Sequence, residues 1–237
     1  MGGGVRLRFD PHVHTGASYD ARGSVDAVLA RCRDQGLDAV AITDHDTDVA
    51  ARRAVTRQDR YGVLVVPGVE ISTADGHLLA LGVSTDPPTG CPFARTVEWV
   101  RDRGGLAVVP HPFQRSRHGV EGGALTDCDG IETFNAWAVT GVQNRRAAVL
   151  ARQRDYPALG GSDAHHPSAV GTAYTEVRTA DETVDAVLDA VAAGRCQAVG
   201  SSYPLRASLR KYAAAVGRWV RSDDGAPGPS QARSPGT

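Results

Sequence analysis

Short apolar runs alternate with segments of helical periodicity from the start of the chain. A strand is expected at residues 6–9, a helix at 25–35 and a second strand at 37–43. Ser24 precedes this helix as an N-cap, and Gly36 stands just beyond its last turn, where glycine commonly ends a helix. The order of strand, helix and strand is typical of a βαβ unit, in which one helix face packs on a sheet.

The same alternation continues along about 200 residues of the chain. Further strands are expected at 63–66, 77–83, 106–110, 130–134, 158–161, 174–177 and 197–199. Further helices are expected at 49–60, 96–103, 144–154 and 182–193. This pattern predicts an α/β fold in which helices surround a closed or nearly closed barrel of strands. A doubly wound open sheet is the alternative, because periodicity does not show whether a sheet closes.

The pattern changes near the end of the sequence. Apolar residues at helical spacing predict a helix over residues 205–220, which would dock on the barrel; a membrane or partner helix is the alternative. Residues 221–237 are rich in Ser, Asp, Gly, Pro and Arg, which predicts a disordered tail. The expected organisation is therefore a barrel domain over residues 1–204, followed by the helix and the tail.

Composition and charge narrow the classes of protein. Of the 237 residues, 41% are hydrophobic and 22% are charged, which is the ordinary balance of a soluble globular protein. The net charge of -1 gives no reason to expect stable binding of duplex nucleic acid or an anionic membrane. The four cysteines lie far apart and form no CxxC pair, and no segment approaches the length of a membrane span. A cytoplasmic protein is expected, while its oligomeric state stays open.

Two histidines, His12 and His14, come directly after the first expected strand. In extended backbone, side chains two residues apart point to the same side, so both imidazoles could bind one metal ion. Such a pair is also common on polar surfaces. The interpretation as a metal site therefore needs further ligands.

More metal-binding side chains stand at the ends of other expected strands. The active sites of βα-barrels lie at the C-terminal ends of their strands, so these side chains are expected to meet. The set holds imidazoles and carboxylates but no thiolate, which suits Zn²⁺, Mn²⁺ or Fe²⁺ in a catalytic site. With one bridging carboxylate, two or three ions could be held. The additional candidates are His45, Glu70, His111, Asp163 and His165.

Five motifs in this order, HxH, TDHD, GVE, HP and SDAH, resemble the polymerase and histidinol phosphatase (PHP) family. The resemblance extends over about residues 9–177. It implies a single distorted (β/α)7 barrel with a di- or trinuclear metal site at the C-terminal ends of the strands, and it places Glu70 in the metal-bridging position. The residues that match ligand positions of the family are His12, His14, His45, Glu70, His111, Asp163 and His165.

Four further residues are candidates for the site. Asp20 is the nearest match to a ligand that the family often has after HxH, although it is offset by one residue, and a loop cap is the alternative. His77 is expected to complete the second metal or to contact substrate, unless it is a buried polar side chain with its own partner. Arg115 and Arg117 follow His111, and either guanidinium could hold a phosphate or belong to an exposed loop.

Two residues near the expected site have supporting roles. Asp10 is expected to orient a ligand imidazole through a carboxylate–histidine hydrogen bond. Trp137 follows another strand end, where it could stack on a base or a sugar. A packed aromatic at the barrel rim is the favoured reading of Trp137.

These residues predict a metal-dependent phosphoesterase in which a metal-activated hydroxide attacks phosphorus. The expected substrate is a small phosphomonoester or a nucleotide, and one alternative is a 5′-to-3′ exonuclease that trims short oligonucleotides. A hydrolase of a carbon ester, amide or carbamate is a second alternative, because the same metals also activate carbonyl groups. A non-catalytic, metal-stabilised module is disfavoured by the nearly complete ligand set. If both arginines pointed away from the metals, phosphate would lose its best anchor.

Overall fold

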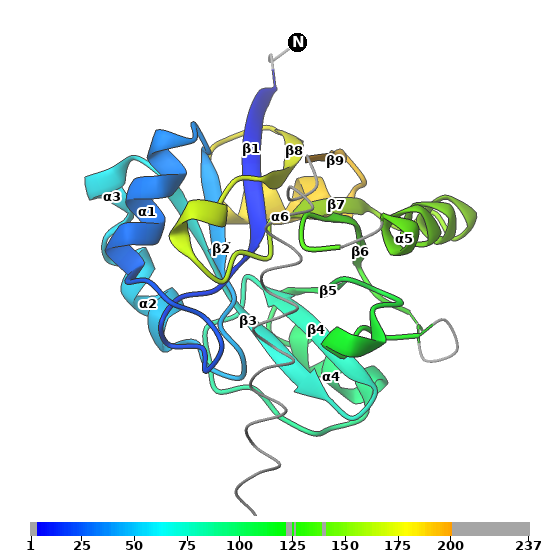
Figure 1. Cartoon of the computed structure of the whole chain (residues 1–237). Coiled ribbons are helices and arrows are strands. Elements are labelled where there is room, and N and C mark those ends of the chain that lie inside the picture. Colours follow the sequence, from blue (N-terminus) through cyan, green and yellow to red (C-terminus); the bar gives the residue numbers. More distant parts are fainter. Residues whose placement is uncertain (1–3, 122–124, 126, 139–140, 201–237) are drawn as a thin grey trace, which may run out of the picture. The chain divides into compact units, whose positions relative to one another are not determined.

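The computed structural model describes residues 4–200 of the chain, except residues 122–124, 126 and 139–140 (Figure 1). The strands in this part form one sheet in the order β7-β6-β5-β4-β3-β2-β1-β8-β9. They are β1 (Val5–Val13), β2 (Ala39–Ile42), β3 (Leu64–Thr73), β4 (Gly76–Leu81), β5 (Leu106–Val109), β6 (Gly130–Asn135), β7 (Ala158–Gly161), β8 (Ala173–Thr179) and β9 (Cys196–Gly200). The helices are α1 (Val25–Asp34), α2 (Val49–Val55), α3 (Gln58–Tyr61), α4 (Phe93–Arg101), α5 (Val142–Gln153) and α6 (Val184–Ala192), with short 3₁₀ turns at Arg115–Arg117 and Pro167–Ala169.

The sheet curls into a nearly closed barrel. Val13 at the end of β1 forms an isolated parallel bridge with Ala164, just after β7, and the His14 N–H donates to the Ala164 carbonyl at 2.9 Å. At β7 itself, the Thr175 hydroxyl of β8 lies 3.0 Å from the Gly160 nitrogen and 2.9 Å from its oxygen. These contacts confirm the expected barrel. The sheet has nine strands among the described residues, so the expected count of seven strands is not confirmed.

Strand direction departs from the regular βα alternation that the sequence predicted. The pairs β1–β2, β2–β3, β5–β6 and β6–β7 are parallel, whereas β4 is antiparallel to both of its neighbours. Thr73 pairs with Gly76 across a two-residue turn, which leaves no room for a helix between β3 and β4. Strand β8 is antiparallel to β1 and β9 to β8.

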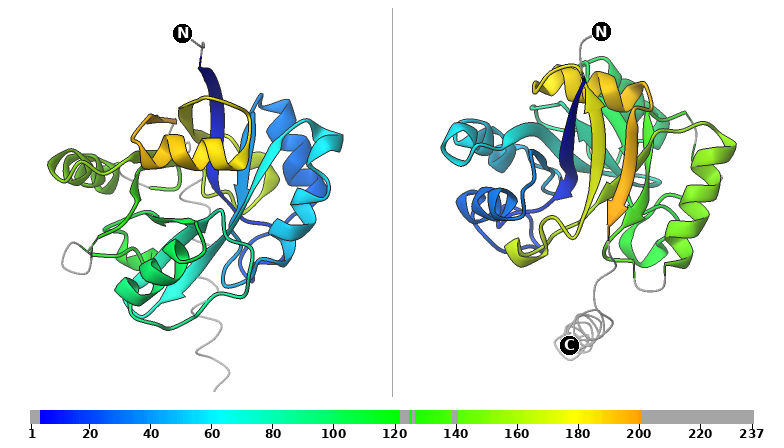
Figure 2. Two further views of the ribbon diagram at one scale, coloured as in Figure 1. Left: turned by 180° about the vertical axis from the view of Figure 1, so that it is seen from behind. Right: turned by 90° about the horizontal axis from the view of Figure 1, so that it is seen from above.

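The first helix follows its sequence signals closely. The Ser24 side chain accepts a hydrogen bond from the Ala27 N–H, and Gly36 adopts a left-handed conformation with φ of 64°. The single helix expected at residues 49–60 is wrong, because α2 ends before Arg57 and α3 begins after it. The Arg57 guanidinium forms an ion pair with Asp26 of α1. Figure 2 (right) shows α1, α2 and α3 on one side of the barrel strands and α5 on the other.

Inward-facing apolar side chains fill the barrel beneath the site. Strands β1, β3, β4, β5, β7 and β8 each contribute to one buried cluster, which also includes Val187, Leu188 and Val191 of α6. Figure 2 (left) shows α6 lying across this part of the sheet. Each fully buried Leu or Val side chain stabilises the fold by about 1.5–3 kcal/mol, so this cluster is a rigid base for the polar end of the barrel. A second apolar cluster joins β3–β6 to α4 and α5.

The helix expected at residues 205–220 and the tail at 221–237 lie outside the described residues. Within the described part, no helix is both long enough and apolar enough to cross a membrane.

Candidate metal centre

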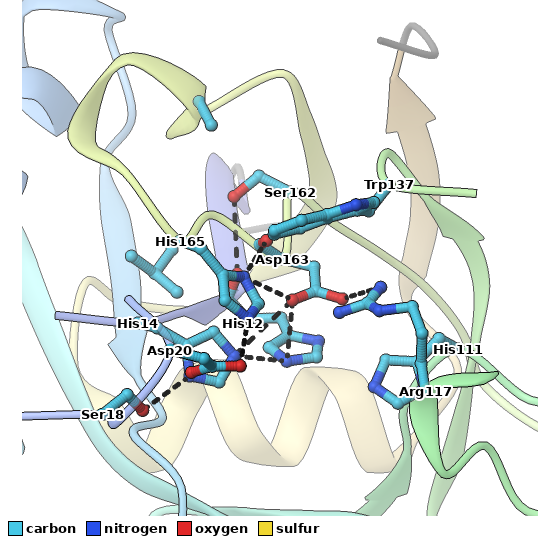
Figure 3. Close-up of polar contacts among 12 residues, drawn as sticks. His12, His14, Ser18, Asp20, His111, Arg117, Trp137, Ser162, Asp163 and His165 are labelled. Atoms are coloured by element: carbon cyan, nitrogen blue, oxygen red, sulfur yellow. Dashed lines mark hydrogen bonds and ion pairs between the residues drawn. The ribbon is translucent and has the colours of Figure 1, made fainter. Parts of the chain in front are cut away.

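The seven side chains matched to ligand positions meet at the C-terminal ends of the barrel strands, and Figure 3 shows several of them. Their ring nitrogens and carboxylate oxygens form overlapping groups in which the atoms of each group lie within 4.8 Å of one another. These groups are His12 with His14 and Glu70, His12 with His111 and Asp163, His14 with His45 and His165, and His45 with Glu70 and His77.

A local irregularity in β1 turns His12 and His14 toward the site. Leu7 and Phe9 belong to the apolar cluster inside the barrel, so unbroken alternation would point His12 and His14 to the opposite face. The pairing of β1 with β2 shifts register between Asp10 and Val13. Such an irregularity re-aims the side chains that follow it, which explains how apolar and ligand residues of one strand face the same interior.

Glu70 lies at the centre of the cluster and uses its two oxygens in different directions. Its Oε2 is 3.0 Å from His12 Nε2 and 3.1 Å from His14 Nε2. Its Oε1 is 3.0 Å from His111 Nε2 and 2.9 Å from His77 Nδ1. Both oxygens of this buried carboxylate therefore face imidazole nitrogens, and a carboxylate with imidazoles is a donor set that suits divalent metal ions.

Asp20 extends the cluster at its outer side. Its Oδ2 lies 3.0 Å from His165 Nε2 and 3.6 Å from His45 Nε2. The rings of His14 and His165 are 4.4 Å apart between centroids, so this outer group adjoins the inner one. The structure therefore brings Asp20 to the ring nitrogens of His45 and His165, despite its offset in sequence.

The electrostatics of the cluster favour added positive charge. Burial would lower the pKa of His14, but the Asp163 and Glu70 carboxylates beside its ring outweigh burial and raise that pKa to about 9. Burial likewise opposes the charge on Glu70, yet the neighbouring His12 charge and hydrogen bonds from His111 hold the pKa of this carboxyl well below its usual range. Protons on the imidazoles balance the negative charge of these buried carboxylates. Divalent cations can balance the same charge equally well.

The arrangement of lone pairs supports the same conclusion. His12 Nε2 and His14 Nε2 face each other at 3.1 Å, a distance at which two neutral acceptors would repel. Asp163 Oδ1 lies 3.3–3.6 Å from three imidazoles, and it is buried without a hydrogen-bond partner in the described part of the chain. The donor set of imidazole and carboxylate fits Zn²⁺, Mn²⁺ or Fe²⁺.

Two expected ligands occupy unusual backbone conformations. His111 has a φ of 30° and Asp163 a φ of 51°, both in the left-handed region that non-glycine residues rarely adopt. Such conformations persist where surrounding contacts hold them, and they cluster at functional sites. For Asp163 the flanking bonds are the Ser162 N–H to Asp10 at 3.0 Å and the bridge from Ala164 to Val13.

The two arginines that follow His111 have different partners in the structure. Arg117 reaches the cluster, where its Nη1 lies 2.5 Å from Asp163 Oδ2 and its guanidinium stacks 4.8 Å from the Trp137 ring centroid (Figure 3). Arg115 pairs with Glu121 instead, and its side chain is 81% exposed against 21% for Arg117. The substrate role expected of Arg115 finds no support in this placement, because its charge faces Glu121 and solvent.

Aromatic rings border the cluster on two sides. Trp137 packs edge-on against His165 with 4.1 Å between ring centroids. Tyr19 stacks on His45 at 5.1 Å, and it is 80% exposed. The His118 ring lies tilted against that of His77, with 5.1 Å between their centroids.

The expected role of Asp10 is wrong. Its buried carboxylate accepts hydrogen bonds from backbone N–H groups, among them those of Ser162 at 3.0 Å and Gly171 at 3.1 Å, and contacts no imidazole. The carboxylate beside His12 is Glu132, whose Oε1 lies 3.1 Å from His12 Nδ1. The signal in the sequence that could have identified Glu132 is a charged residue inside an otherwise uncharged, mostly buried strand.

Ser18 is a second residue that the sequence did not single out. Its hydroxyl oxygen accepts from the His45 N–H at 2.9 Å and lies 3.2 Å from His14 Nδ1. It thereby ties two expected ligands to the loop that carries Asp20.

The sequence matches two protein-family models and several known proteins. Residues 10–156 match the model of the PHP domain, and residues 141–196 match that of a PHP-associated region. An uncharacterized protein of Methanocaldococcus jannaschii is 32% identical over 154 residues, which are 60% of this chain and 89% of that protein. The 5′-3′ exoribonuclease Rnm of Escherichia coli is 30% identical over 132 residues, or 50% of this chain and 45% of Rnm.

The fold has a counterpart among solved structures. A two-domain protein of Bacteroides vulgatus, described as containing a predicted PHP-like metal-dependent phosphoesterase, superposes with a TM-score of 0.71 at 19% identity. The match covers 84% of this chain and 66% of that one. The PHP model spans more than half of the sequence, and its match includes four strand-end motifs from HxH to HP. The chain therefore belongs to the PHP domain family, a family of metal-dependent phosphoesterases.

Proposed function

We propose that the chain hydrolyses a phosphate monoester of a nucleotide or another small phosphorylated metabolite. The observation that carries this proposal is Arg117, whose guanidinium lies within the ligand cluster beside Asp163. A planar guanidinium offers several N–H groups in the geometry of phosphate oxygens. Hydrolysis of a carbon ester, amide or carbamate needs no such fixed cation beside the metals, so Arg117 favours the phosphoester.

The residues divide into groups with different tasks. Divalent ions bound by the cluster would activate water and neutralise charge on the phosphoryl group. Glu70, with its two oxygens, would hold ions together with His12, His14, His77, His111 and Asp163. The outer group of Asp20, His45 and His165 would hold a further ion, which would supply positive charge to the phosphoryl group.

Arg117 would bind the phosphoryl oxygens and stabilise negative charge as it develops. The Trp137 ring stacks on the Arg117 guanidinium and restricts its orientation. Asp163 Oδ2 forms an ion pair with one nitrogen of the same guanidinium. A cation that is already oriented in a buried site contributes more to the transition state than one that must be ordered during the reaction.

A second candidate is trimming of short oligonucleotides from the 5′ end. Tyr19 beside His45 is an exposed aromatic ring on which a base could stack. Rnm carries the name of a 5′-3′ exoribonuclease, although this chain covers less than half of its length.

The test is hydrolysis of a nucleoside monophosphate, a phosphomonoester without a ring and a short 5′-phosphorylated oligoribonucleotide. The protein is loaded in turn with Mn²⁺, Zn²⁺ and Fe²⁺, and His45→Ala is the inactive control. Metal-dependent release of inorganic phosphate supports the phosphatase, whereas stepwise release of nucleotides supports the exonuclease. Turnover of neither, with hydrolysis of a carbon ester, would overturn the proposal.

A further inference from the structure

Glu132 is a buried carboxylate that contacts His12 and His111 of the candidate metal centre directly and Asp163 through Asn135. It is on β6 and is 0% exposed. Its Oε1 lies 3.1 Å from His12 Nδ1, and its Oε2 accepts from the His111 N–H at 2.7 Å and from Asn135 Nδ2 at 2.8 Å. A carboxylate without water around it is stable only when such donors satisfy it, so these three contacts determine its orientation.

The neighbouring strand leaves space for this carboxylate. A Cβ atom at Gly161 of β7 would lie 2.2 Å from Glu132 Oε1 and 2.9 Å from the Cβ of His12. Because atoms cannot approach this closely, any larger residue at Gly161 would push the Glu132 carboxylate away from His12. The glycine is thus required by the contact between Glu132 and His12.

Asn135 connects the same carboxylate to Asp163. Its Nδ2 donates to Glu132 Oε2 at 2.8 Å and to Asp163 Oδ2 at 2.9 Å, while its Oδ1 accepts from the Trp137 N–H at 2.9 Å. The backbone of Asn135 is held in turn by Asn144, through bonds of 3.2 Å and 3.1 Å. Each polar atom of the Asn135 amide therefore has a defined partner.

We propose that Glu132 is a positioning residue that makes His12 a metal ligand through Nε2. A carboxylate beside Nδ1 keeps the ring proton there, so the Nε2 lone pair is free and faces His14 and Glu70. Through Asn135, the same group holds Asp163 Oδ2, which leaves Asp163 Oδ1 directed at the imidazoles. This inference concerns metal binding and does not depend on which phosphate ester is the substrate.

The substitution Glu132→Gln tests the tautomer with little change of shape. The His111 N–H is a fixed backbone donor, so the glutamine oxygen would turn toward it and place the NH₂ group beside His12 Nδ1. His12 would then have to accept at Nδ1 and carry its proton on Nε2, which blocks metal binding by this atom. Glu132→Asp keeps the charge but shortens the side chain and should recover part of the affinity.

The experiment is competition for Zn²⁺ between the protein and a chromogenic chelator, with the number of bound ions counted by elemental analysis. Removal of such a partner typically weakens metal binding about 10–100-fold, and we expect this loss for an ion held by His12 in Glu132→Gln. The matched control is Asp129→Asn, which removes a carboxylate near the start of the same strand that bonds the Ala107 N–H and Arg101. It should lower thermal stability and leave Zn²⁺ affinity unchanged.

Equal Zn²⁺ affinity and stoichiometry in wild type and Glu132→Gln would overturn the proposal. A measurement on the wild-type protein covers the case in which the variant does not fold. In the Zn²⁺-loaded protein, ¹⁵N chemical shifts of the His12 ring should show a protonated Nδ1 and a metal-bound Nε2. A metal-bound Nδ1, or an unprotonated one, would equally overturn it.

Discussion

Arg117 shows how one side chain connects the expected metal ligands to the expected substrate. Burial opposes its charge, but the nearby Asp163, Glu70 and Glu132 carboxylates outweigh burial and raise the pKa of Arg117 above its usual value. Arg117 is therefore charged at neutral pH. Arg115, only two residues away, is paired with Glu121 at the surface.

Replacing Arg117 by Ala should lower kcat/KM for a phosphate monoester on the order of 100-fold, as loss of one oriented charge donor does elsewhere. The reason is loss of a fixed cation beside the phosphoryl group. Steady-state kinetics with the Mn²⁺-loaded protein measure this, and Arg115→Ala serves as the control with near wild-type rates. Equal losses in both variants would contradict the assignment.

Tyr19→Ala should weaken binding of substrates that carry a base. Stacking on an aromatic side chain contributes about 1–3 kcal/mol per base, so KM for a nucleoside monophosphate should rise about tenfold. KM for glycerol phosphate, which has no ring, should not change. An equal rise for both substrates would indicate that Tyr19 supports His45 and does not stack on substrate.

At the scale of elements, short irregular contacts hold the strand ends in place. Strand β7 is linked to β8 through the side chain of Thr175 and to β1 through Asp10 and the bridge from Val13 to Ala164. These links involve Gly160, Ser162 and Ala164, which lie close to Asp163 and His165 in the sequence. The positions of the ligands therefore depend on the closure of the barrel.

Thr175→Val should destabilise the fold by about 1–3 kcal/mol, because the buried amide and carbonyl of Gly160 would lose their partner. Thr175→Ser keeps the hydroxyl and should cost less. Urea denaturation of the metal-loaded proteins measures both changes. A stable Thr175→Val protein would show that the barrel closes without this contact.

At the scale of the whole molecule, the net charge of -1 conceals a concentration of ionisable groups at one end of the barrel. Glu70, Glu132 and Asp163 are buried there among six imidazoles. Without added cations, Arg117 and the imidazoles of His12 and His14, whose pKa values are raised, balance part of this negative charge. The stability of the whole domain should consequently depend on bound metal.

Removal of metal should lower the melting temperature of the protein. Ligands that bind only the folded state at a thousand times their Kd stabilise it by about 4 kcal/mol, which corresponds to about 10 °C for a domain of this size. Thermal scans in the presence of a chelator, and after Zn²⁺ or Mn²⁺ is restored, measure the shift. Identical melting temperatures would contradict a structural contribution of the metals.

The sequence by itself determined the type of fold and the type of site. Expected ligands such as His12, His111 and Asp163 follow expected strands directly, and strand ends converge in any barrel, so their meeting could be foreseen. The boundaries of α1 followed from Ser24 and Gly36, because capping is a local interaction.

Only the tertiary structure decided which side chains meet which. The hairpin of β3 and β4, the break before α3 and the partner of Arg115 depend on contacts between segments far apart in sequence or on the geometry of a turn. The same holds for the exchange of roles between Asp10 and Glu132. Asp10 lies two residues from His12, but Glu132 lies beside its ring because closure of the barrel brings β6 and β7 to β1. Periodicity gives the side on which a residue lies, whereas hydrogen-bond partners depend on the neighbours that folding brings together.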